Sequence, residues 1–426
     1  MNILVVGGGG REHAIIKQLR KNPRCEQIWA LPGNGGIAQD AECAAIAATD
    51  LDGICAFAAA HPVDFAVVAP DDPLAMGLVD RLHELGIPCF GPVAAAARIE
   101  ASKGFAKELM QKNSIPTAEY ALFSDYEQAV AYVEEKGAPI VVKADGLALG
   151  KGVTVAQSVE EAKAALKRAM LDKAFGASGD QVLVEECLTG PEVTVLAFTD
   201  GHTLVPMVAS MDHKRAQDGD RGPNTGGMGV IAPNPFYTPE IAERCMKEIF
   251  LPTIRAMAQA GHPFKGCLYF GLMLTEQGPK VIEYNCRFGD PEAQAVLPLL
   301  ETDLLEIMLA VEEERLDQVD VRFRSDASCC VVLASDGYPG HYDKGLPITD
   351  SLDAGDADVT LFHAGTKLDG GRVVTNGGRV LSLTAVAEDL PAAIAKSYRA
   401  VEQVSFANKY YRHDIGQAAL KALERK

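Results

Sequence analysis

The sequence has no apolar stretch approaching the roughly 20 residues that a bilayer requires. Its first residues, MNILVV, form a short β-branched run without the basic start and the small-residue cleavage site of a signal peptide. These absences argue against a membrane-spanning protein. We expect the chain to work in the cytoplasm, with no membrane partner.

Positive charge is also scarce. Lysine and arginine number 40 against 58 aspartates and glutamates, which gives a formal net charge of −18 at pH 7. Such a chain repels the backbone of nucleic acids at long range, so no nucleic-acid partner is expected. Any phosphate that the protein binds must meet basic groups gathered locally.

The sequence also lacks CxxC pairs, although it contains ten cysteines. Two of them, Cys329 and Cys330, are neighbours, and on a strand they would point to opposite faces of the sheet. We therefore expect buried, reduced thiols.

The length and the order of patterns indicate several domains. At 426 residues the chain exceeds the size at which one hydrophobic core stops growing, about 250–300 residues. Continuous β-branched runs alternate with helical periods over 1–101, which predicts an α/β domain built on a doubly wound parallel sheet. A second domain is expected over 102–326, with a small α+β lid at about 119–190. A third, mixed and β-rich domain is expected over 327–426.

Four glycines, Gly7 to Gly10, stand between the first strand and the first helix, in MNILVVGGGGREHA. A dinucleotide site needs GxGxxG and an acidic residue about 20 positions further on. Here the third glycine position holds Glu12 or His13, and the next strand ends in Pro32-Gly33, so a nicotinamide cofactor is disfavoured. Two interpretations fit this stretch equally well. It could bind one phosphate through the backbone amides at the helix start and Arg11, or it could simply be a tight corner between strand and helix.

A second glycine-rich stretch, PIVVKADGLALGKGVTV, has a strand ending at Lys143 and then a loop with Gly146, Gly150, Lys151 and Gly152. Glycines let backbone amides approach phosphate oxygens, and lysines offset the phosphate charge. The loop is not a Walker loop, because Lys151 is followed by glycine where GxxxxGK[ST] needs serine or threonine. A triphosphate site and a hairpin tip with solvated lysines both remain open.

The stretch QVLVEECLTGPE predicts a strand ending in Glu185 and Glu186, with Leu188 and Glu192 beyond it. A nucleotide base can bond to the backbone of such an edge, and a carboxylate such as Glu192 can reach ribose hydroxyls. Taken alone, this stretch favours the alternative of a solvated acidic strand end.

Alternation along KVIEYNCRFGDPE places Glu283, Asn285 and Arg287 on one face of a strand. Carboxylate and amide oxygens on one face suit Mg²⁺, which keeps several waters and contacts nucleotide phosphates. The nearby arginine can neutralise transferring charge. We prefer this site to the alternative of a solvent-facing polar stripe.

The stretch MDHKRAQDGDRGPNTGGMG carries Asp212, His213, Lys214 and Arg215 ahead of a segment too rich in glycine for a strand or a helix. Mixed charge and conformational freedom favour a substrate loop that becomes ordered on binding.

Taken together and in this order, these motifs resemble the ATP-grasp ligases and, within them, the glycinamide ribonucleotide synthetase (phosphoribosylamine–glycine ligase) family. The resemblance covers essentially the whole chain, from GGREHA and PGN through SKGF, VVKADGLALGKGV, DHKR, GPNTGGMG and YNCRFGDPE to FHAGTK and VTNGGRV. It implies an ATP-grasp core with a lid between the two outer domains.

The resemblance also implies the chemistry. ATP, glycine and 5-phosphoribosylamine would give ADP, phosphate and glycinamide ribonucleotide through glycyl phosphate, in purine biosynthesis, with Mg²⁺ or Mn²⁺. A monomer is expected.

The resemblance carries residue roles onto this sequence. The ATP contacts would be Lys103, Lys143, Gly146, Gly150, Lys151, Gly152, Glu185, Glu186, Leu188 and Glu192. The metal ligands would be Glu283 and Asn285, and the residues acting on the transferred groups Arg287, Lys143, Asp212 and Lys214. The substrate contacts would be Gly8, Gly9, Gly10, Arg11, Glu12, Asn224, Thr225, Gly226, Gly227, Met228, Asp290 and Glu292, of which Asp290 and Glu292 are inferred to position glycine.

The chain departs from the family pattern in a few places. It has Glu100-Ala101-Ser102-Lys103 where EGSK is usual, and Asp71 where the family commonly has glutamate. The strand LYFGLML lacks the acidic metal ligand of many ATP-grasp proteins. The alternatives are another ATP-grasp ligase or carboxylase, against which GGREHA and GPNTGGMG argue, and a non-catalytic nucleotide-binding module, against which Lys143 and the Glu283-to-Arg287 set argue.

Overall fold

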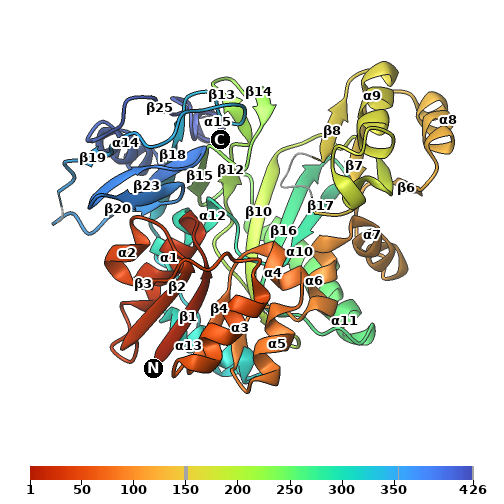
Figure 1. Ribbon diagram of the computed structural model, residues 1–426. Helices are drawn as coiled ribbons and strands as arrows, with labels where there is room; N and C mark the ends of the chain where they lie inside the picture. Colours follow the sequence, from red (N-terminus) through yellow and green to blue (C-terminus); the bar gives the residue numbers. More distant parts are fainter. Residues whose placement is uncertain (148–151, 354, 425–426) are drawn as a thin grey trace.

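The computed structural model describes residues 1–147, 152–353 and 355–424. Three lobes surround a central antiparallel sheet (Figure 1). The N-terminal sheet lies at the lower left, the C-terminal sheet at the upper left and a small lobe with α8 and α9 at the upper right. Among the described residues, no helix is both long and apolar enough to cross a bilayer.

The N-terminal lobe is the predicted doubly wound sheet, with all strands parallel in the order β3-β2-β1-β4-β5. The strands are β1 (Asn2–Gly7), β2 (Gln27–Pro32), β3 (Glu42–Cys43), β4 (Phe65–Val68) and β5 (Cys89–Phe90). The helices are α1 (Gly10–Leu19), α2 (Ile37–Asp40), α3 (Leu51–Ala60), α4 (Asp71–Ala75), α5 (Leu78–Glu84) and α6 (Ala94–Ala101). The strand order reverses between β1 and β4, and ligands of such sheets bind where the carboxyl ends of these strands part. The glycines after β1 and Asp71 after β4 lie there.

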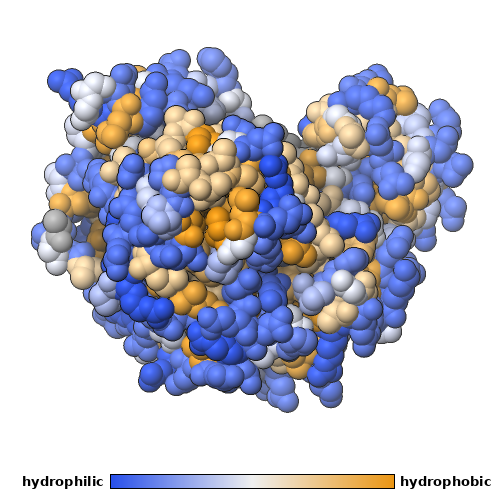
Figure 2. Space-filling view, turned by 60° about the horizontal axis from the view of Figure 1, so that its bottom comes forward, coloured by the Kyte–Doolittle hydropathy of each residue, from blue (hydrophilic) through white to orange (hydrophobic). Residues whose placement is uncertain are grey.

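The small lobe has an antiparallel sheet in the order β6-β9-β7-β8, covered by two helices. Its elements are β6 (Tyr120–Phe123), α8 (Tyr126–Lys136), β7 (Ile140–Ala144), β8 (Val153–Ala156), α9 (Val159–Met170) and β9 (Val182–Glu186). Asp125 and Ser158 cap the two helices by accepting from the backbone N–H of Gln128 and Glu161. The lobe has its own apolar cluster, and Figure 2 shows it set off from the main body by a notch. The small lobe therefore has a core of its own, and its role as a lid stays a prediction.

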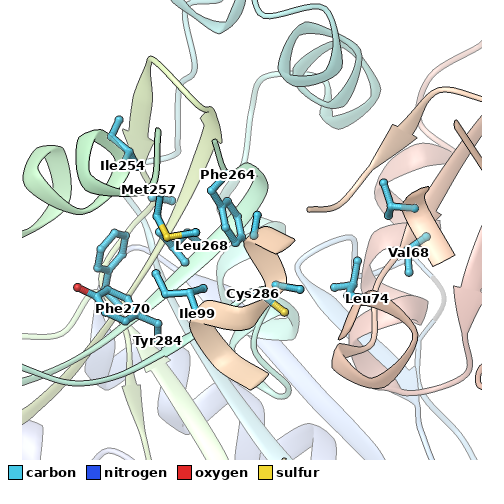
Figure 3. Packing of buried hydrophobic residues seen from close by; sticks show 14 of the residues in the cluster. Val68, Leu74, Ile99, Ile254, Met257, Phe264, Leu268, Phe270, Tyr284 and Cys286 are labelled. Atoms are coloured by element: carbon cyan, nitrogen blue, oxygen red, sulfur yellow. The ribbon is translucent and has the colours of Figure 1, made fainter. Parts of the chain in front are cut away.

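The central sheet has the order β11-β10-β16-β17 and carries the predicted metal strand at its edge. Its strands are β10 (Glu192–Asp200), β11 (Leu204–Pro206), β16 (Lys265–Thr275) and β17 (Gly278–Asn285). The helices α7 (Lys103–Lys112), α10 (Pro239–Cys245) and α11 (Leu251–Gln259) pack nearby, the last two joined by a π-helical turn over Met246–Phe250. Figure 3 shows Ile99 of α6 lying among Phe270, Tyr284 and Leu268, which fixes α6 to this sheet.

The C-terminal sheet takes strands from two parts of the chain. In the order β12-β15-β18-β23-β20, with β25 on β18, its strands are β12 (Met211–Asp212), β15 (Gly229–Ala232), β18 (Ala327–Ser335), β23 (Arg379–Ala387), β20 (Val359–His363) and β25 (Lys409–Tyr410). Because β12 and β15 precede residue 327, the expected boundary at 326/327 runs between strands that hydrogen-bond to one another. Other elements of this half are α12 (Glu292–Val296), α13 (Leu304–Glu312), β19 (Thr349–Asp350), β21 (Thr366–Asp369), β22 (Arg372–Thr375), α14 (Leu390–Val401), β24 (Val404–Ser405) and α15 (Gln417–Leu423).

The expectation of a strand-free segment after Asp212 was wrong. Strands β13 (Arg215–Gln217) and β14 (Arg221–Asn224) form a hairpin there. Gly219 and Asp220, at φ 69° and 53°, adopt the left-handed turn that joins the two strands. The glycines in this stretch therefore make a tight turn and do not prevent strand pairing.

All ten cysteines are free thiols, as expected. Cys329 and Cys330 are neighbours on β18 and are buried in two different apolar clusters, on opposite faces of the sheet.

Candidate active site

A cavity of about 920 Å³ lies where the lobes meet. Arg11 and Asp71 reach it from the N-terminal lobe, Lys143 from the lid and Arg379 from the C-terminal sheet. The sequence-predicted residues that line it are Arg11, Lys103, Lys143, Gly152, Glu185, Glu186, Leu188, Glu192, Asp212, Lys214, Asn224, Thr225, Gly226, Glu283, Asn285, Arg287, Asp290 and Glu292. Residues predicted from separate sequence motifs therefore lie around the same cavity.

Two lysines converge on a buried carboxylate at the lid side of this cavity. Lys143 Nζ lies 2.9 Å from Glu185 Oε2 and donates to the Ile282 carbonyl at 3.1 Å. Lys107 Nζ lies 3.5 Å from the other oxygen, Glu185 Oε1. Burial lowers the pKa of Lys107 to about 8. The Glu185 carboxylate thus lies between two lysine ammonium groups. This rules out, for Glu185, the alternative of an acidic strand end exposed to solvent.

Lys103 begins α7 directly after the capping residue Ser102. Its Nζ donates to the Gly146 carbonyl at 3.1 Å, while Asp145 Oδ1 accepts from the Gly104 N–H at 2.6 Å. The start of α7 therefore holds the start of the second glycine-rich loop. Gly146 itself is not among the cavity-lining residues, and the predictions for Gly150 and Lys151 concern residues outside the described ranges.

Glu283 and Asn285 face the cavity from the end of β17, as alternation predicts. Lys214 Nζ lies 3.0 Å from Glu192 Oε2 and 3.9 Å from Glu283 Oε1. Burial opposes ionisation of Glu283, but Lys214 and Lys143 lower its pKa, so the carboxylate is charged.

This pair fits a magnesium-type ion that completes its shell with phosphate oxygens and water. The two side chains offer one carboxylate and one amide oxygen, which are hard ligands of the kind Mg²⁺ prefers. Within the described ranges, no three His, Cys, Asp or Glu side chains gather as a metal cluster. An ion bound at Glu283 and Asn285 would therefore need the nucleotide for much of its coordination.

Arg287 is partly buried beside the Glu100 carboxylate, with Nη2 2.8 Å from Oε1. Burial opposes its charge, yet Glu100 and Asp71 raise its pKa, so Arg287 stays protonated. Its Nε has no hydrogen-bond partner. A partly buried cation that lines the cavity and has an unused, buried N–H donor is suited to an anion that arrives with substrate.

Asp212 and Glu292 are two neighbouring acidic residues that line the same cavity. Burial and the neighbouring Glu292 raise the pKa of Asp212 well above its usual range, and burial raises that of Glu292. Asp212 Oδ1 is buried without a hydrogen-bond partner. The raised pKa makes this carboxyl a stronger proton acceptor than an ordinary aspartate.

The opening glycines are needed for close packing. A Cβ on Gly8 would meet the Gly33 carbonyl, and one on Gly10 would meet the Gln294 side chain. The Gly9 N–H donates to Glu12 Oε2 at 2.5 Å, and the Arg11 N–H to Asp290 Oδ2 at 3.4 Å. Those helix amides already have carboxylate acceptors, and Gly8, Gly9, Gly10 and Glu12 are not among the cavity-lining residues. A phosphate site there remains a prediction; of the residues from Gly8 to Glu12, Arg11 alone lines the cavity, and it is 9% exposed with its guanidinium donating to Glu12 and to the Phe288 carbonyl.

The loop after β14 reaches the cavity with its first half only. Asn224, Thr225 and Gly226 line it, whereas Gly227 does not and Met228 is fully buried. The C-terminal lobe holds this loop, because the Gly226 N–H donates to Tyr338 Oη at 3.2 Å and Arg379 Nη1 donates to the Gly226 carbonyl at 2.6 Å.

Several lining residues were missed by the sequence analysis: Lys107, Tyr269, Tyr338 and Arg379. Arg379 closes the NGGR stretch quoted for the resemblance, which was the one available signal. The others carry no local pattern that separates them from core or surface residues.

Comparison with known proteins agrees with this geometry. The chain matches the phosphoribosylglycinamide synthetase N domain over residues 1–100, the ATP-grasp (A) domain over 101–293 and the C domain over 328–418. It is 47% identical over 429 residues to the phosphoribosylamine–glycine ligase of Vibrio vulnificus strain YJ016, covering 100% of both chains. It is 48% identical over 420 residues to the protein of that name from Rhizobium meliloti strain 1021, covering 99% of both.

Solved structures show the same architecture. The phosphoribosylamine–glycine ligase of Thermotoga maritima superposes with a TM-score of 0.86 at 33% identity, over 97% of this chain and 100% of that one. A biotin carboxylase domain from Hydrogenobacter thermophilus shares the fold, with a TM-score of 0.75 at 18% identity over 96% of this chain and 91% of that one. The expected fold class, with an ATP-grasp core between the outer domains, is confirmed, and the chain belongs to the phosphoribosylglycinamide synthetase family, the phosphoribosylamine–glycine ligases.

Proposed function

We propose that this chain joins glycine to 5-phosphoribosylamine at the expense of ATP, giving glycinamide ribonucleotide, ADP and phosphate for purine biosynthesis. The proposal rests on family membership and on one observation: a single cavity brings lysines 103, 143 and 214 and Arg287 together with Glu283 and Asn285. A triphosphate and a carboxylate repel each other. Cationic side chains and oxygen ligands for a metal ion in the same cavity can offset that repulsion and let the two groups react.

In the first step, a glycine carboxylate oxygen attacks the γ-phosphorus of ATP, and ADP leaves. Lys103, Lys143 and Arg287 offset the charge of the approaching anions, because like charges would otherwise keep the carboxylate from the triphosphate. Glu283 and Asn285 would hold Mg²⁺ or Mn²⁺, which when bound neutralises phosphate charge. Glu185, Glu186, Leu188 and Glu192 lie along the cavity where the nucleoside would sit.

In the second step, the amine of phosphoribosylamine attacks the glycyl carbonyl carbon, and phosphate leaves with the oxygen that came from glycine. The attacking amine must lose a proton, and we assign its acceptance to Asp212 Oδ1, the buried oxygen without a partner. Asp290 and Glu292 are proposed to position glycine, and Arg11 with the Asn224–Gly226 loop to contact the ribose phosphate. A closed lid would exclude water from the acyl phosphate.

The test is phosphate release from ATP in the presence of Mg²⁺, with and without glycine and freshly generated phosphoribosylamine, with the product identified by mass. We expect release to require both substrates and the product to have the mass of glycinamide ribonucleotide. With ¹⁸O in the glycine carboxylate, one label should appear in the released phosphate. Unlabelled phosphate would contradict the glycyl phosphate route, and ATP binding without product would contradict the ligase.

The finer assignments belong to the same proposal. We propose a cytoplasmic monomer that binds small molecules only, with domains at 1–101, 102–326 and 327–426 and a lid at about 119–190. The distinct apolar cluster of the lid supports its treatment as a unit.

A further inference from the structure

Glu100 lies at the end of α6, buried at 7% exposure, next to the end of β17. Its Oε2 accepts from the Cys286 N–H at 2.7 Å, and its Oε1 accepts from Arg287 Nη2 at 2.8 Å. Hydrogen-bond donors and acceptors around the Asn285 amide fix that group so that Nδ2 donates to Glu100 Oε1 at 2.8 Å and to the Tyr284 carbonyl at 3.2 Å. One carboxylate thus binds three consecutive residues of the predicted metal and phosphoryl site.

The carboxylate cannot easily move away from these donors. Ile99, the preceding residue, is 1% exposed and packs among Phe270, Tyr284 and Leu268 (Figure 3). Ser102, two residues after Glu100, caps the N-terminus of α7. Packing on one side and a helix start on the other therefore fix the position of Glu100 relative to β17.

The position of Glu100 determines which atom Asn285 presents to the cavity. A primary amide has two N–H donors and one carbonyl oxygen. Glu100 and the Tyr284 carbonyl take both donors, which leaves Oδ1 on the other side of the amide as the available ligand. Without an acceptor at Glu100, the amide could rotate and offer N–H groups, which repel a cation.

We propose that Glu100 is a positioning residue: it orients Asn285 as an oxygen ligand for the divalent ion and holds Arg287 beside it. This rests on the proposed function, which assigns the ion to Glu283 and Asn285. Partners of this kind typically change metal affinity by about 10–100-fold when they are lost. The assignment also gives a physical role to the first residue of the Glu100-Ala101-Ser102-Lys103 stretch.

The test measures Mn²⁺ binding in the presence of saturating ADP, from the electron paramagnetic resonance signal of free Mn²⁺. Glu100→Gln keeps the shape of the side chain but turns an N–H₂ group toward the donors. We expect about 10-fold weaker Mn²⁺ binding. The Mg²⁺ concentration for half-maximal turnover should rise by a similar factor, with a smaller change in the KM for glycine. Unchanged Mn²⁺ affinity would overturn the proposal.

A double-mutant cycle identifies the route of the effect. Asn285→Ala should weaken Mn²⁺ binding by itself, and adding Glu100→Gln to it should cause little further loss, because the group that Glu100 orients is gone. Full additivity, or no effect of Asn285→Ala, would overturn the positioning role. If Glu100→Gln does not fold, Glu100→Asp, which keeps the charge but shortens the side chain, is measured with the same expectation.

A matched control is Asp200→Asn. Asp200 is 2% exposed and accepts from the backbone N–H of Leu316 at 3.1 Å and of Thr203 at 2.7 Å, outside the cavity lining. It should lose stability without a change in Mn²⁺ affinity, and a change equal to that of Glu100→Gln would overturn the proposal. If the wild type forms no glycinamide ribonucleotide while Glu100→Gln still weakens Mn²⁺ binding, the proposed function fails and the positioning role stands.

Discussion

Two cavities in the described part of the molecule have nearly equal volumes, about 920 and 950 Å³. The first lies between the lid, the central sheet and the outer lobes. The second lies between α1 and α2 of the N-terminal lobe and β20 of the C-terminal lobe, and is lined by His13, Lys17, Asp40 and His363 among others. Volume alone does not tell them apart.

The difference lies in the state of their buried polar atoms. Asp212 Oδ1 and Arg287 Nε belong to residues that line the first cavity and have no hydrogen-bond partner, and Glu185 Oε1 has only its 3.5 Å ion pair with Lys107. Among the residues described around the second cavity, none carries a buried side-chain atom without a hydrogen bond. In the second cavity, His13 Nδ1 accepts from the His363 N–H at 2.8 Å, and His13 Nε2 donates to Asp40 Oδ2 at 3.0 Å. Buried groups left unpaired are costly, so their concentration marks the cavity that is built for a ligand.

The largest effect should follow from removing Lys143, in the first cavity. Lys143→Ala leaves the Glu185 carboxylate, which is 4% exposed, without its 2.9 Å partner. Breaking a buried pair costs about 3–5 kcal/mol. Because Lys107 Nζ still lies 3.5 Å from Glu185 Oε1, we expect a loss toward the lower end of that range in the free energy of unfolding measured with urea. The control is Lys173→Ala, which breaks an exposed lid pair with Asp180 and should cost at most about 1 kcal/mol. Equal losses for the two variants would refute the role assigned to burial.

The second prediction compares the effect on kcat of removing one arginine from each cavity. Arg287→Ala should lower kcat by about 10²–10³ while ATP binding is largely kept, because a preorganised donor for the transferring group is lost. Arg324→Ala removes an arginine from the lining of the second cavity, where it pairs with Asp326 and Asp358, and should leave kcat unchanged. Steady-state kinetics and nucleotide titration of both variants check this, and wild-type turnover in Arg287→Ala would contradict it.

A packing change in the second cavity should affect stability alone. A Cβ on Gly36 would collide with the His363 ring, and overpacking of this kind costs about 1–3 kcal/mol. We expect Gly36→Ala to lower the thermal midpoint while kcat stays at the wild-type value. Adding His363→Gly removes both the ring and the Cβ that the new methyl group would meet, so the two changes should not be additive. A drop in kcat for Gly36→Ala would show that the second cavity takes part in the reaction.

The smallest effect concerns pH. Burial, followed by the neighbouring His13, lowers the pKa of His363 to about 3. Because the folded state keeps this histidine neutral while the unfolded chain protonates it near pH 6.5, its contribution to stability is present above pH 6.5 and is lost as the pH falls toward 3. Between pH 7.5 and 5.5 this amounts to about 1.4 kcal/mol. Urea unfolding at both pH values should show a smaller decrease for His363→Asn than for the wild type, and equal decreases would contradict the assignment.

Local patterns predicted the parts of the protein whose signal is local. Continuous β-branched runs indicated the parallel sheet, and alternation along β17 placed Glu283 and Asn285 on one side of the strand. Alternation was informative there because the pairing with β16 is regular from Glu283 to Asn285, beyond the register shift between Val281 and Glu283. The resemblance then connected motifs that lie far apart in the sequence.

Other features depend on contacts that no local pattern encodes. Glu100 meets Cys286 and Arg287 across 186 and 187 positions of the chain, so its role becomes visible only in three dimensions. Arg379 holds the loop at Gly226 in the same long-range manner. The β13–β14 hairpin was missed because a glycine-rich composition is shared by loops and tight turns, and the pairing partner decides between them.

The C-terminal sheet restricts how the chain can be divided. A fragment that stops at residue 326 would keep β15 but lose β18, the strand against which Gly229–Ala232 pairs. The buried side chains of Val230 and Ile231 and the hydrogen-bonding edge of β15 would then face water, and such an edge invites pairing with other molecules. For engineered fragments, reporter fusions or rearranged gene orders, residues 211–232 therefore have to be kept together with the C-terminal hundred residues.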